Sequence, residues 1–446
     1  MRGHNAEQEG GHTSPRPAKN RYRSVSVNDK RVAMLLEGLQ GGDVIVGIDI
    51  AKTRQFAAFE QEGKVHGIVR FEHPRESRQF LKLLSQLKVG GDVVVALEPS
   101  STYGDALRHA FMKAGLDVRR VSPNRTHKAA EVYDGVPSYH DAKSAAIICK
   151  MHRDGISEPW PMASEYQRGL TAALRLMTIY QKQFRDNRNR LESLTARHWP
   201  ELPRVLELGS VTLLELLIEY GSAESLTRDP EKARAFMRRK GRAMLKQEKI
   251  DAVISNASDS FGLPPTPDEI VMIQELARET RRCQKAMNQA KKRVEAMTDE
   301  NGPANELRPV VGKTTAAILI AAAGDPKDYG SASAYQKALG LNLKEKSSGT
   351  SRGGLHITKR GSGVARHYLF LAALRLLQRD PVVRGWYLKK VARSGGAMKL
   401  KAVIAIMRKL VRALWHVAHG CVFDSHKLYD TSRLQLDPMP TTMEAS

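Results

Sequence analysis

Three acidic residues in the first third of the chain have the type and placement that gather a divalent metal ion. Asp49 lies in VIVGIDIAK, Glu98 in VVVALEPSSTYG and Asp141 in PSYHDAKSAAIIC. Carboxylate oxygens are the ligands that Mg²⁺ prefers, and this ion keeps waters and binds substrate phosphates. Like charges a few ångströms apart repel, so acids that converge need a cation between them. The sequence therefore predicts a Mg²⁺ or Mn²⁺ site that acts on phosphate groups.

Each acid has its own place on a predicted element. We expect Asp49 within a buried strand, Glu98 at the carboxyl end of another strand, and Asp141 at the start of a helix. Sites in open α/β sheets form at the carboxyl ends of strands. Taken singly, each acid also has an ordinary alternative: a cap or turn for Asp49, a surface position for Glu98, and helix N-capping for Asp141.

Strands and helices alternate around these acids. The expected strands are VIVGIDIA, TRQFAAFEQ, KVHGIVRFE, DVVVALEPS and DVRRVS, and the expected helices are ESRQFLKLLSQL and residues 105–113 and 141–152. Strands that lead into helices indicate an α/β layer with a mixed sheet.

The rest of the chain is read as helical. Two long Arg-rich amphipathic helices are expected over 165–198 and 267–297, packed either as an antiparallel coiled-coil hairpin or as ordinary bundle helices. The segment between them carries KARAFMRRKGRAMLKQEKI, which is either a solvated helical face or a phosphate track. The last part begins with PVVGKTTAAILIAAAG, passes through a loop rich in Gly, Ser and Lys, and ends in helices.

We therefore expect five regions along the chain. They are a basic, disordered N-terminus (1–42), an α/β domain (43–160), a helical or coiled-coil region (161–305), a helical C-terminal domain with a serine-bearing loop (306–425) and a polar tail (426–446).

Charge and composition narrow the class of partner. Lys and Arg number 71 against 48 Asp and Glu, a formal net charge of +23, which favours a polyanion such as DNA. Cys149, Cys283 and Cys421 lie too far apart in sequence to indicate a disulfide framework or a zinc site. The chain lacks a secretory signal and a membrane-length apolar run, so we expect a cytoplasmic protein with no membrane partner.

The VVGKTT segment imitates a phosphate-binding loop of nucleotide-binding proteins. A P-loop needs a glycine five positions before Gly312, and that position is Leu307, so ATP binding is rejected.

The order of a strand Asp, a strand-end Glu and a helix Asp resembles the RNase H-like, RuvC-type nuclease fold. More narrowly, VGIDIAK, ALEPSSTYG and the P-S-x-x-D-x-K-x-A pattern of PSYHDAKSA resemble the N-terminal domain of DEDD-type insertion-sequence transposases, which are related to the Piv and MooV DNA invertases. PVVGKTTAAILIAAAGDP and YQKALGLNLKEKSSGTSRGGLHITKRGSGVARHYLFLAAL resemble the second domain of the same family, with a helix-hairpin-helix. The resemblance covers roughly residues 43–155 and 306–420.

This resemblance implies a transposase that cuts and rejoins DNA, guided by a structured bridge RNA and acting as a homo-oligomer, either a dimer or a tetramer. It implies a fourth acid one helical turn after Asp141, where this chain has Ser144, so three carboxylates and one hydroxyl would serve the metal. It also implies that Ser348 is the nucleophile, with Ser347 as the neighbour that could be confused with it.

Basic residues of the second block are expected to bind nucleic-acid phosphates. They are Lys313, Arg352, Lys359, Arg360 and Arg366. Two other functions remain open from the residues: a metal-dependent nuclease or Holliday-junction resolvase that uses only the carboxylates, and a non-catalytic nucleic-acid-binding protein, which Ser144 motivates.

Overall fold

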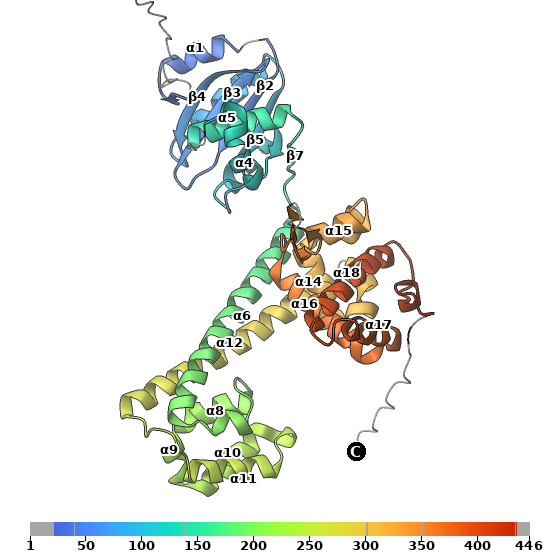
Figure 1. Ribbon diagram of the computed structural model, residues 1–446. Coiled ribbons are helices and arrows are strands. Elements are labelled where there is room, and N and C mark those ends of the chain that lie inside the picture. The colour runs from blue at the N-terminus through green and yellow to red at the C-terminus, as the bar shows by residue number, and fades with distance from the viewer. Residues whose placement is uncertain are drawn as a thin grey trace, which may run out of the picture. The chain divides into compact units, whose positions relative to one another are not determined.

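The computed structural model describes residues 22–39, 41–136, 140–299, 302–345, 347–348, 351–432 and 434. The chain divides into two compact units, Met1–Met162 and Ala163–Ser446, coloured blue to cyan and green to red in Figure 1. Within the described ranges, none of the helices combines the length and the apolar character that crossing a bilayer requires.

The first unit is built on a seven-stranded mixed sheet. Its strands are β1 (Ser24–Ser26), β2 (Val44–Asp49), β3 (Arg54–Gln61), β4 (Lys64–Glu72), β5 (Val93–Leu97), β6 (Asp117–Arg120) and β7 (Glu158–Pro159), in the order β1-β4-β3-β2-β5-β6-β7. Strands β2, β3 and β4 form an antiparallel meander, and β5 and β6 run parallel to β2. A meander followed by parallel strands is the RNase H-like arrangement, so the expected α/β fold is confirmed.

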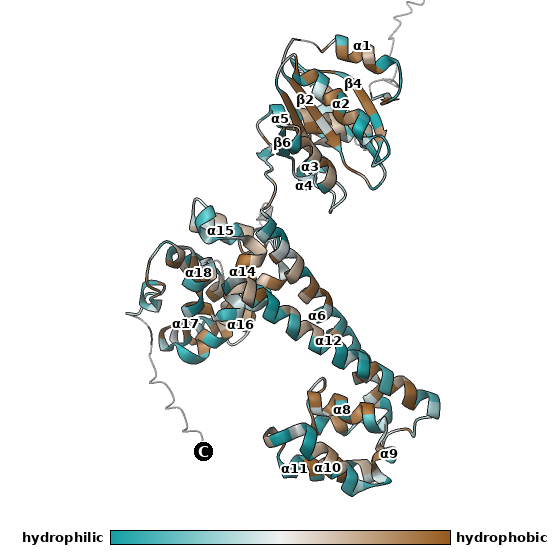
Figure 2. Cartoon of the chain, turned by 180° about the vertical axis from the view of Figure 1, so that it is seen from behind, coloured by the Kyte–Doolittle hydropathy of each residue, from teal (hydrophilic) through white to brown (hydrophobic). Residues whose placement is uncertain are grey.

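Helices cover both faces of this sheet because its strands are apolar on both sides (Figure 2). The face that carries Val46 and Ile48 packs against α1 (Arg31–Glu37), α2 (Ser77–Lys88) and α3 (Asp105–Lys113). The opposite face packs against α4 (Pro123–Asp134) and α5 (Asp141–Arg153). Successive side chains of a strand point to opposite faces, so Asp49 shares the α5 face with Gly47.

Strand β1 and helix α1 lie inside the segment expected to be disordered, so that expectation is wrong for residues 24–37. Residues Ser24–Ser26 pair in parallel with the edge strand β4, and Val32 and Leu39 are buried in the core of the unit. Hydrogen bonds and burial that the sheet supplies give this short polar stretch its structure. Residues 1–21 and 40 lie outside the described residues.

Two long helices form the spine of the second unit. Helices α6 (Glu165–His198) and α12 (Pro267–Asp299) pack antiparallel, so that the Tyr166 hydroxyl near the start of α6 donates to the Met297 carbonyl near the end of α12 at 3.1 Å (Figure 1). Both helices match the ranges expected from sequence. A separate hydrophobic core sits at each end of the pair.

At one end is a distal lobe of short helices. They are α7 (Leu202–Val205), α8 (Val211–Tyr220), α9 (Ala223–Thr227), α10 (Pro230–Gly241), η1 (Arg242–Met244) and α11 (Gln247–Ser258). Basic side chains of α10 are partnered: Arg234 by Asp251, and Lys240 by Glu215 at 2.8 Å. These pairings favour a solvated, ion-paired face over a phosphate track for the basic stripe.

At the other end is the C-terminal lobe. Its helices are α13 (Pro303–Val311), α14 (Lys313–Ala323), η2 (Pro326–Asp328), α15 (Ala332–Ala338), α16 (Gly363–Arg379), α17 (Pro381–Ala392), α18 (Lys399–Ala418) and η3 (Ser425–Lys427). Helices α13 and α14 meet at Gly312 as the expected helix-hairpin-helix. Tyr429 is buried in the core of this lobe, so a polar tail from residue 426 is wrong for the first residues of that segment.

Candidate active site

The site begins with an unusually close contact between β2 and α5. A Cβ atom on Gly47 would stand 2.4 Å from the Ala145 carbonyl oxygen and 2.7 Å from the Cys149 amide nitrogen, so only glycine fits. The Gly47 amide donates to Cys149 Sγ at 3.0 Å, and the thiol donates to the Ala58 carbonyl at 3.3 Å. Burial raises the pKa of the Cys149 thiol, which therefore stays protonated as this donor. The contact sets α5 directly over the end of β2.

Asp49, the last residue of β2, is the electrostatic centre of the site. Burial, then the negative charges of Glu98 and Asp141, raise the pKa of Asp49 to about 7, while a hydrogen bond from Ser144 lowers it. Since charges act strongly only at short range in a partly buried site, both other acids lie near Asp49. The structure thus brings the three acids and the serine together at one edge of the sheet.

The first turn of α5 supplies two of these residues. His140 is the N-cap of α5, because its ring Nδ1 accepts from the Lys143 amide at 3.3 Å. Asp141 is therefore not needed as the cap, and its carboxylate is exposed. The buried Lys143 amine donates to the Val136 carbonyl at 2.6 Å and fastens the start of the helix.

Glu98 directly follows β5, as expected, and its amide donates to the Ile48 carbonyl at 3.4 Å, which fixes it beside the end of β2. Burial raises the pKa of Glu98, against a hydrogen bond from Thr126 and the charge of His127, which lower it. Among the described residues, the buried Oε2 atom of Glu98 has no hydrogen-bond partner.

Thr126 and His127 belong to α4, an element that the sequence analysis did not predict. The signal was present, because SPNRTHKAA places Ser122 at the N-cap position and Pro123 at the first helical position. His127, which we interpreted as a surface or core residue, lies close enough to Glu98 to affect its pKa.

The chemistry of this site fits a divalent metal ion. An unpartnered buried carboxylate oxygen on Glu98 and an Asp49 crowded by two acids are both relieved by a cation. No three His, Cys, Asp or Glu side chains in the described ranges form a ready-made group that could hold an ion. Asp49 is the member shared by both neighbours, so any ion held here would draw in Glu98 or the exposed Asp141 by side-chain movement.

The second predicted site lies on a nested β-hairpin of the C-terminal lobe. Strand β8 (Leu343–Lys344) pairs with β11 (His356–Ile357), and β9 (Ser347–Ser348) pairs with β10 (Ser351–Arg352), both antiparallel. Ser348 therefore lies opposite Ser351, next to the tip of the hairpin. Lys346, Gly349 and Thr350 lie outside the described residues.

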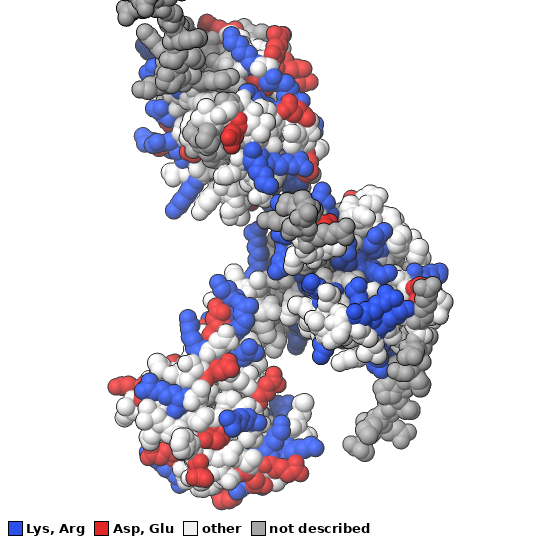
Figure 3. All heavy atoms as spheres, viewed as in Figure 1, with Lys and Arg blue, Asp and Glu red and all other residues white. Residues whose placement is uncertain are grey.

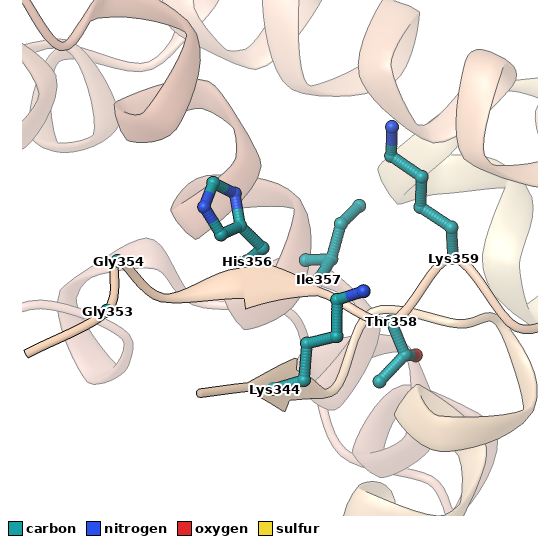
Figure 4. Close-up of a pocket in the computed structure, with 7 residues that line it drawn as sticks. All are labelled: Lys344, Gly353, Gly354, His356, Ile357, Thr358 and Lys359. Atoms are coloured by element: carbon teal, nitrogen blue, oxygen red, sulfur yellow. The ribbon is translucent and has the colours of Figure 1, made fainter. Parts of the chain in front are cut away.

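The base of this hairpin is tightly fixed. The Thr358 hydroxyl donates to Asn342 Oδ1 at 2.6 Å, and the Lys359 amide donates to the Gly340 carbonyl at 3.0 Å. A Cβ on Gly361 would stand 2.4 Å from the Ala338 carbonyl oxygen. Figure 4 shows a cavity of about 400 Å³ beside the strands, with His356 and Lys359 extending to one side of β11 and Lys344 rising from β8.

The predicted phosphate-binding cations have different surroundings. Lys313 is paired with Asp299 at 2.7 Å, and Arg366 donates to the carbonyls of Leu339 and Gly361. The remaining three are Lys359 and Arg360, which are exposed, and Arg352, for which the backbone alone is described. Lys359 and Arg360 are thus the better placed to meet a phosphate.

Comparison with known proteins decides the family. The model for "Transposase IS116/IS110/IS902 family" matches residues 308–388, and a second transposase model, for the DEDD transposases of IS110, matches residues 46–200. The chain belongs to the IS110 family of transposases. The two matched segments contain all of the predicted site residues.

A relative from Streptomyces coelicolor, the insertion element IS110 uncharacterized 43.6 kDa protein, is 25% identical over 396 residues, which are 85% of this chain and 95% of the relative. Thermus thermophilus RuvC, alone and in complex with a Holliday junction substrate, aligns at 15% identity and a TM-score of 0.21, covering 26% of this chain and 99% of RuvC. The RNase H-like fold follows from the strand order itself.

Membership makes this chain a DEDD-type transposase, an enzyme that cleaves and rejoins DNA. It departs from the four-acid pattern of its family at Ser144, which is fully buried and hydrogen-bonded to Asp49. A carboxylate there would face Asp49 in a buried setting, so this chain stabilises Asp49 with a neutral donor instead.

Proposed function

We propose that this transposase cuts and rejoins DNA with two sets of groups: the acids Asp49, Glu98 and Asp141, assisted by Ser144, and a nucleophilic serine, Ser348. The observation that carries the proposal is the gathering of the acids and the serine hydroxyl around Asp49. Bound there, Mg²⁺ or Mn²⁺ would stabilise negative charge on a phosphodiester and assist its oxygens in attack and departure.

The acids of the first unit would orient the scissile phosphate and keep bulk water from the reacting centre. Asp49 is fixed by its place at the end of β2, and Ser144 holds the Asp49 carboxylate by its hydrogen bond. Glu98 presents a buried oxygen with no other partner among the described residues. Such preorganisation is what phosphoryl transfer requires of a protein.

Ser348 would carry the strand between cutting and rejoining. Its Oγ forms a bond to phosphorus as one P–O bond of the DNA backbone breaks, the hydroxyl proton passes to an acceptor, and the departing oxygen takes a proton. Rejoining reverses the exchange with a new DNA hydroxyl, so the energy of the phosphodiester is kept. A free serine hydroxyl is a weak nucleophile, so the acidic site of the same or another subunit would have to meet it.

A structured bridge RNA and a homo-oligomer complete the proposal. The net charge of +23 supports a polyanionic partner beyond a single DNA duplex contact. Guidance by base pairing would place the choice of target sequence in the RNA, with the protein recognising its shape and backbone.

The test is recombination between two plasmids that carry the element ends, with the flanking non-coding segment co-expressed and Mg²⁺ present. Ser348→Ala and Asp49→Asn should each lower recombination at least about a hundredfold, because each removes a group that acts in the transition state. The matched controls Ser347→Ala and Glu37→Gln should recombine normally. A protein–DNA adduct that survives denaturation should form with the native chain and be absent from Ser348→Ala.

Continued DNA cleavage by Ser348→Ala, with no adduct from the native chain, would instead establish a hydrolytic nuclease that uses only the carboxylates. Loss of the adduct in Ser347→Ala but not in Ser348→Ala would transfer the nucleophilic role to Ser347.

A further inference from the structure

A large basic cavity lies on the C-terminal lobe between α15, α17, α18 and the segment that follows α18. It encloses about 930 Å³, and we call it the α18 cavity. Five cationic side chains line it: Lys390, Arg408, Lys409, Arg412 and Lys427. The single carboxylate in the lining is Asp424, which pairs with His426 at 3.4 Å.

The cations of this cavity are crowded and have no acidic partner among the described residues. Burial, and then the charge of Arg412, lower the pKa of both Arg408 and Lys409. Their hydrogen bonds go to backbone carbonyls, Arg408 Nε to Leu341 and Lys409 Nζ to Leu428. Arg412 is exposed. Positive charge gathered in a concavity without carboxylates calls for an anionic ligand.

Aromatic and apolar side chains form the remaining wall. Trp386 lies beneath the Lys390 amine, 5.2 Å from ring centre to nitrogen, and Phe423 has no ring partner among the described residues. Ala405, Ala413 and Val417 of α18 and its neighbourhood add apolar surface. A duplex presents phosphates on a convex surface and has no base to bury here. An unpaired nucleotide has both an anionic phosphate and a flat base that stacks on aromatic rings.

A second cavity of about 500 Å³ adjoins the first, since Trp386 and Lys390 line both. Arg393 and Lys389 belong to this neighbour. The basic surface therefore continues past a single nucleotide, as a strand of several nucleotides requires.

We propose that the α18 cavity binds an unpaired nucleotide of a single-stranded nucleic acid, with Arg412 and Lys390 on its phosphates and Phe423 against its base. The site involves none of the reacting groups named above. It is joined to the Ser348 hairpin through the Leu341 carbonyl, which accepts from Arg408 Nε at 2.9 Å and from Gln336 Nε2 at 3.0 Å just before β8. A strand held in the cavity would thus lie against the support of that hairpin.

The test is fluorescence anisotropy with the full chain in EDTA, so that no metal-dependent reaction occurs. The probes are oligothymidine and oligouridine of about 12 nucleotides, within the span of known single-strand sites, and a duplex of equal length. Phe423→Ala should weaken binding of single strands about tenfold and leave duplex binding unchanged. Arg412→Ala should lower the salt dependence by about 0.7 per phosphate lost, whereas the same loss of charge in Lys401→Ala on α18 should not.

The DNA and RNA probes decide which strand occupies the site. A stronger effect on oligouridine assigns it to the RNA partner, and a stronger effect on oligothymidine assigns it to displaced DNA. Equal losses for single strand and duplex in Phe423→Ala, or equal effects of Arg412→Ala and Lys401→Ala, would overturn the proposal. Arg412 is exposed, so its variant stays informative if Phe423→Ala fails to fold, and recombination by the native chain is scored separately.

Discussion

At the scale of single residues, Asp49 shows how a fold makes a carboxylate reactive toward a cation. Its pKa of about 7 results from burial and from two neighbouring acids, and the Ser144 hydroxyl provides a partial remedy. A cation would provide the complete one, because it satisfies all three acids at once. The serine thus lets the site fold without metal, at the cost of one negative ligand.

Ser144→Asp tests this exchange through stability. The new carboxylate would occupy a fully buried position beside Asp49, and an uncompensated buried charge costs on the order of 3 kcal/mol. In EDTA we expect the melting temperature of the variant to fall by on the order of 10 °C. Added Mg²⁺ or Mn²⁺ should restore most of the loss, as differential scanning fluorimetry would show.

The control for that experiment is Ser85→Asp on the exposed surface of α2, which should melt like the native chain with or without metal. A Ser144→Asp variant that is equally unstable with and without divalent ions would mean that no ion is held beside Asp49.

At the scale of elements, the contact of β2 with α5 positions the site. Gly47 allows α5 to lie against the strand, and two residues later Asp49 meets the first turn of the same helix. A side chain at Gly47 would have to push backbone atoms aside, which overpacked cores resist at about 1–3 kcal/mol.

Gly47→Ala should therefore lower both stability and recombination, since α5 would move away from Asp49. Thermal melting and the plasmid assay measure the two effects. Gly38→Ala is the matched control, because a Cβ there would meet its nearest atoms at 3.6 Å, an ordinary contact. Full recombination by Gly47→Ala would show that the helix need not lie this close.

The distal lobe depends on a second group of charges. Glu215 on α8 accepts from Lys240 on α10 and from Arg281 on α12, at 2.8 and 3.1 Å. Burial alone would raise the pKa of Glu215, but these two partners outweigh it and lower the pKa below its usual 4.5. A lowered carboxyl pKa adds stability that is present above pH 4.5 and is lost as the pH falls through the folded-state value.

We accordingly expect Glu215→Gln to melt at a lower temperature than the native chain at pH 7 and at a similar temperature near pH 3. Melting curves between these values measure the convergence. The exposed Glu207→Gln should follow the native chain throughout. A constant difference at every pH would assign the effect of the substitution to packing.

Periodicity predicted the elements that carry their own pattern. The strand of Asp49, the strand before Glu98 and the long helix α6 have the expected bounds, because alternation and helical spacing are properties of the segment itself. Strand β1 and the hairpin β8–β11 were not predicted, because their strands have two or three residues and form through pairing partners. The acids were predicted from their types, but the N-cap role of His140 and the hydrogen bond to Glu98 from Thr126 required coordinates.

At the scale of the whole molecule, the basic charge is unevenly spread over the second unit. Figure 3 shows Lys and Arg dominating the visible face of the C-terminal lobe, whereas acidic and basic side chains alternate on the distal lobe. The ion pairs of Arg234 and Lys240 explain this difference. Nucleic acid is therefore expected on the lobe that carries the Ser348 hairpin and the α18 cavity, while the distal lobe has a mixed surface suited to protein contacts.

Binding of Mn²⁺ to the full chain, followed by electron paramagnetic resonance of the free ion, tests the acidic site most directly. We predict that the native chain takes up Mn²⁺, that Asp49→Asn abolishes this uptake, that Glu98→Gln and Asp141→Asn each weaken it, and that Glu37→Gln leaves it unchanged. Equal uptake by the native chain and the three acid variants would contradict the account.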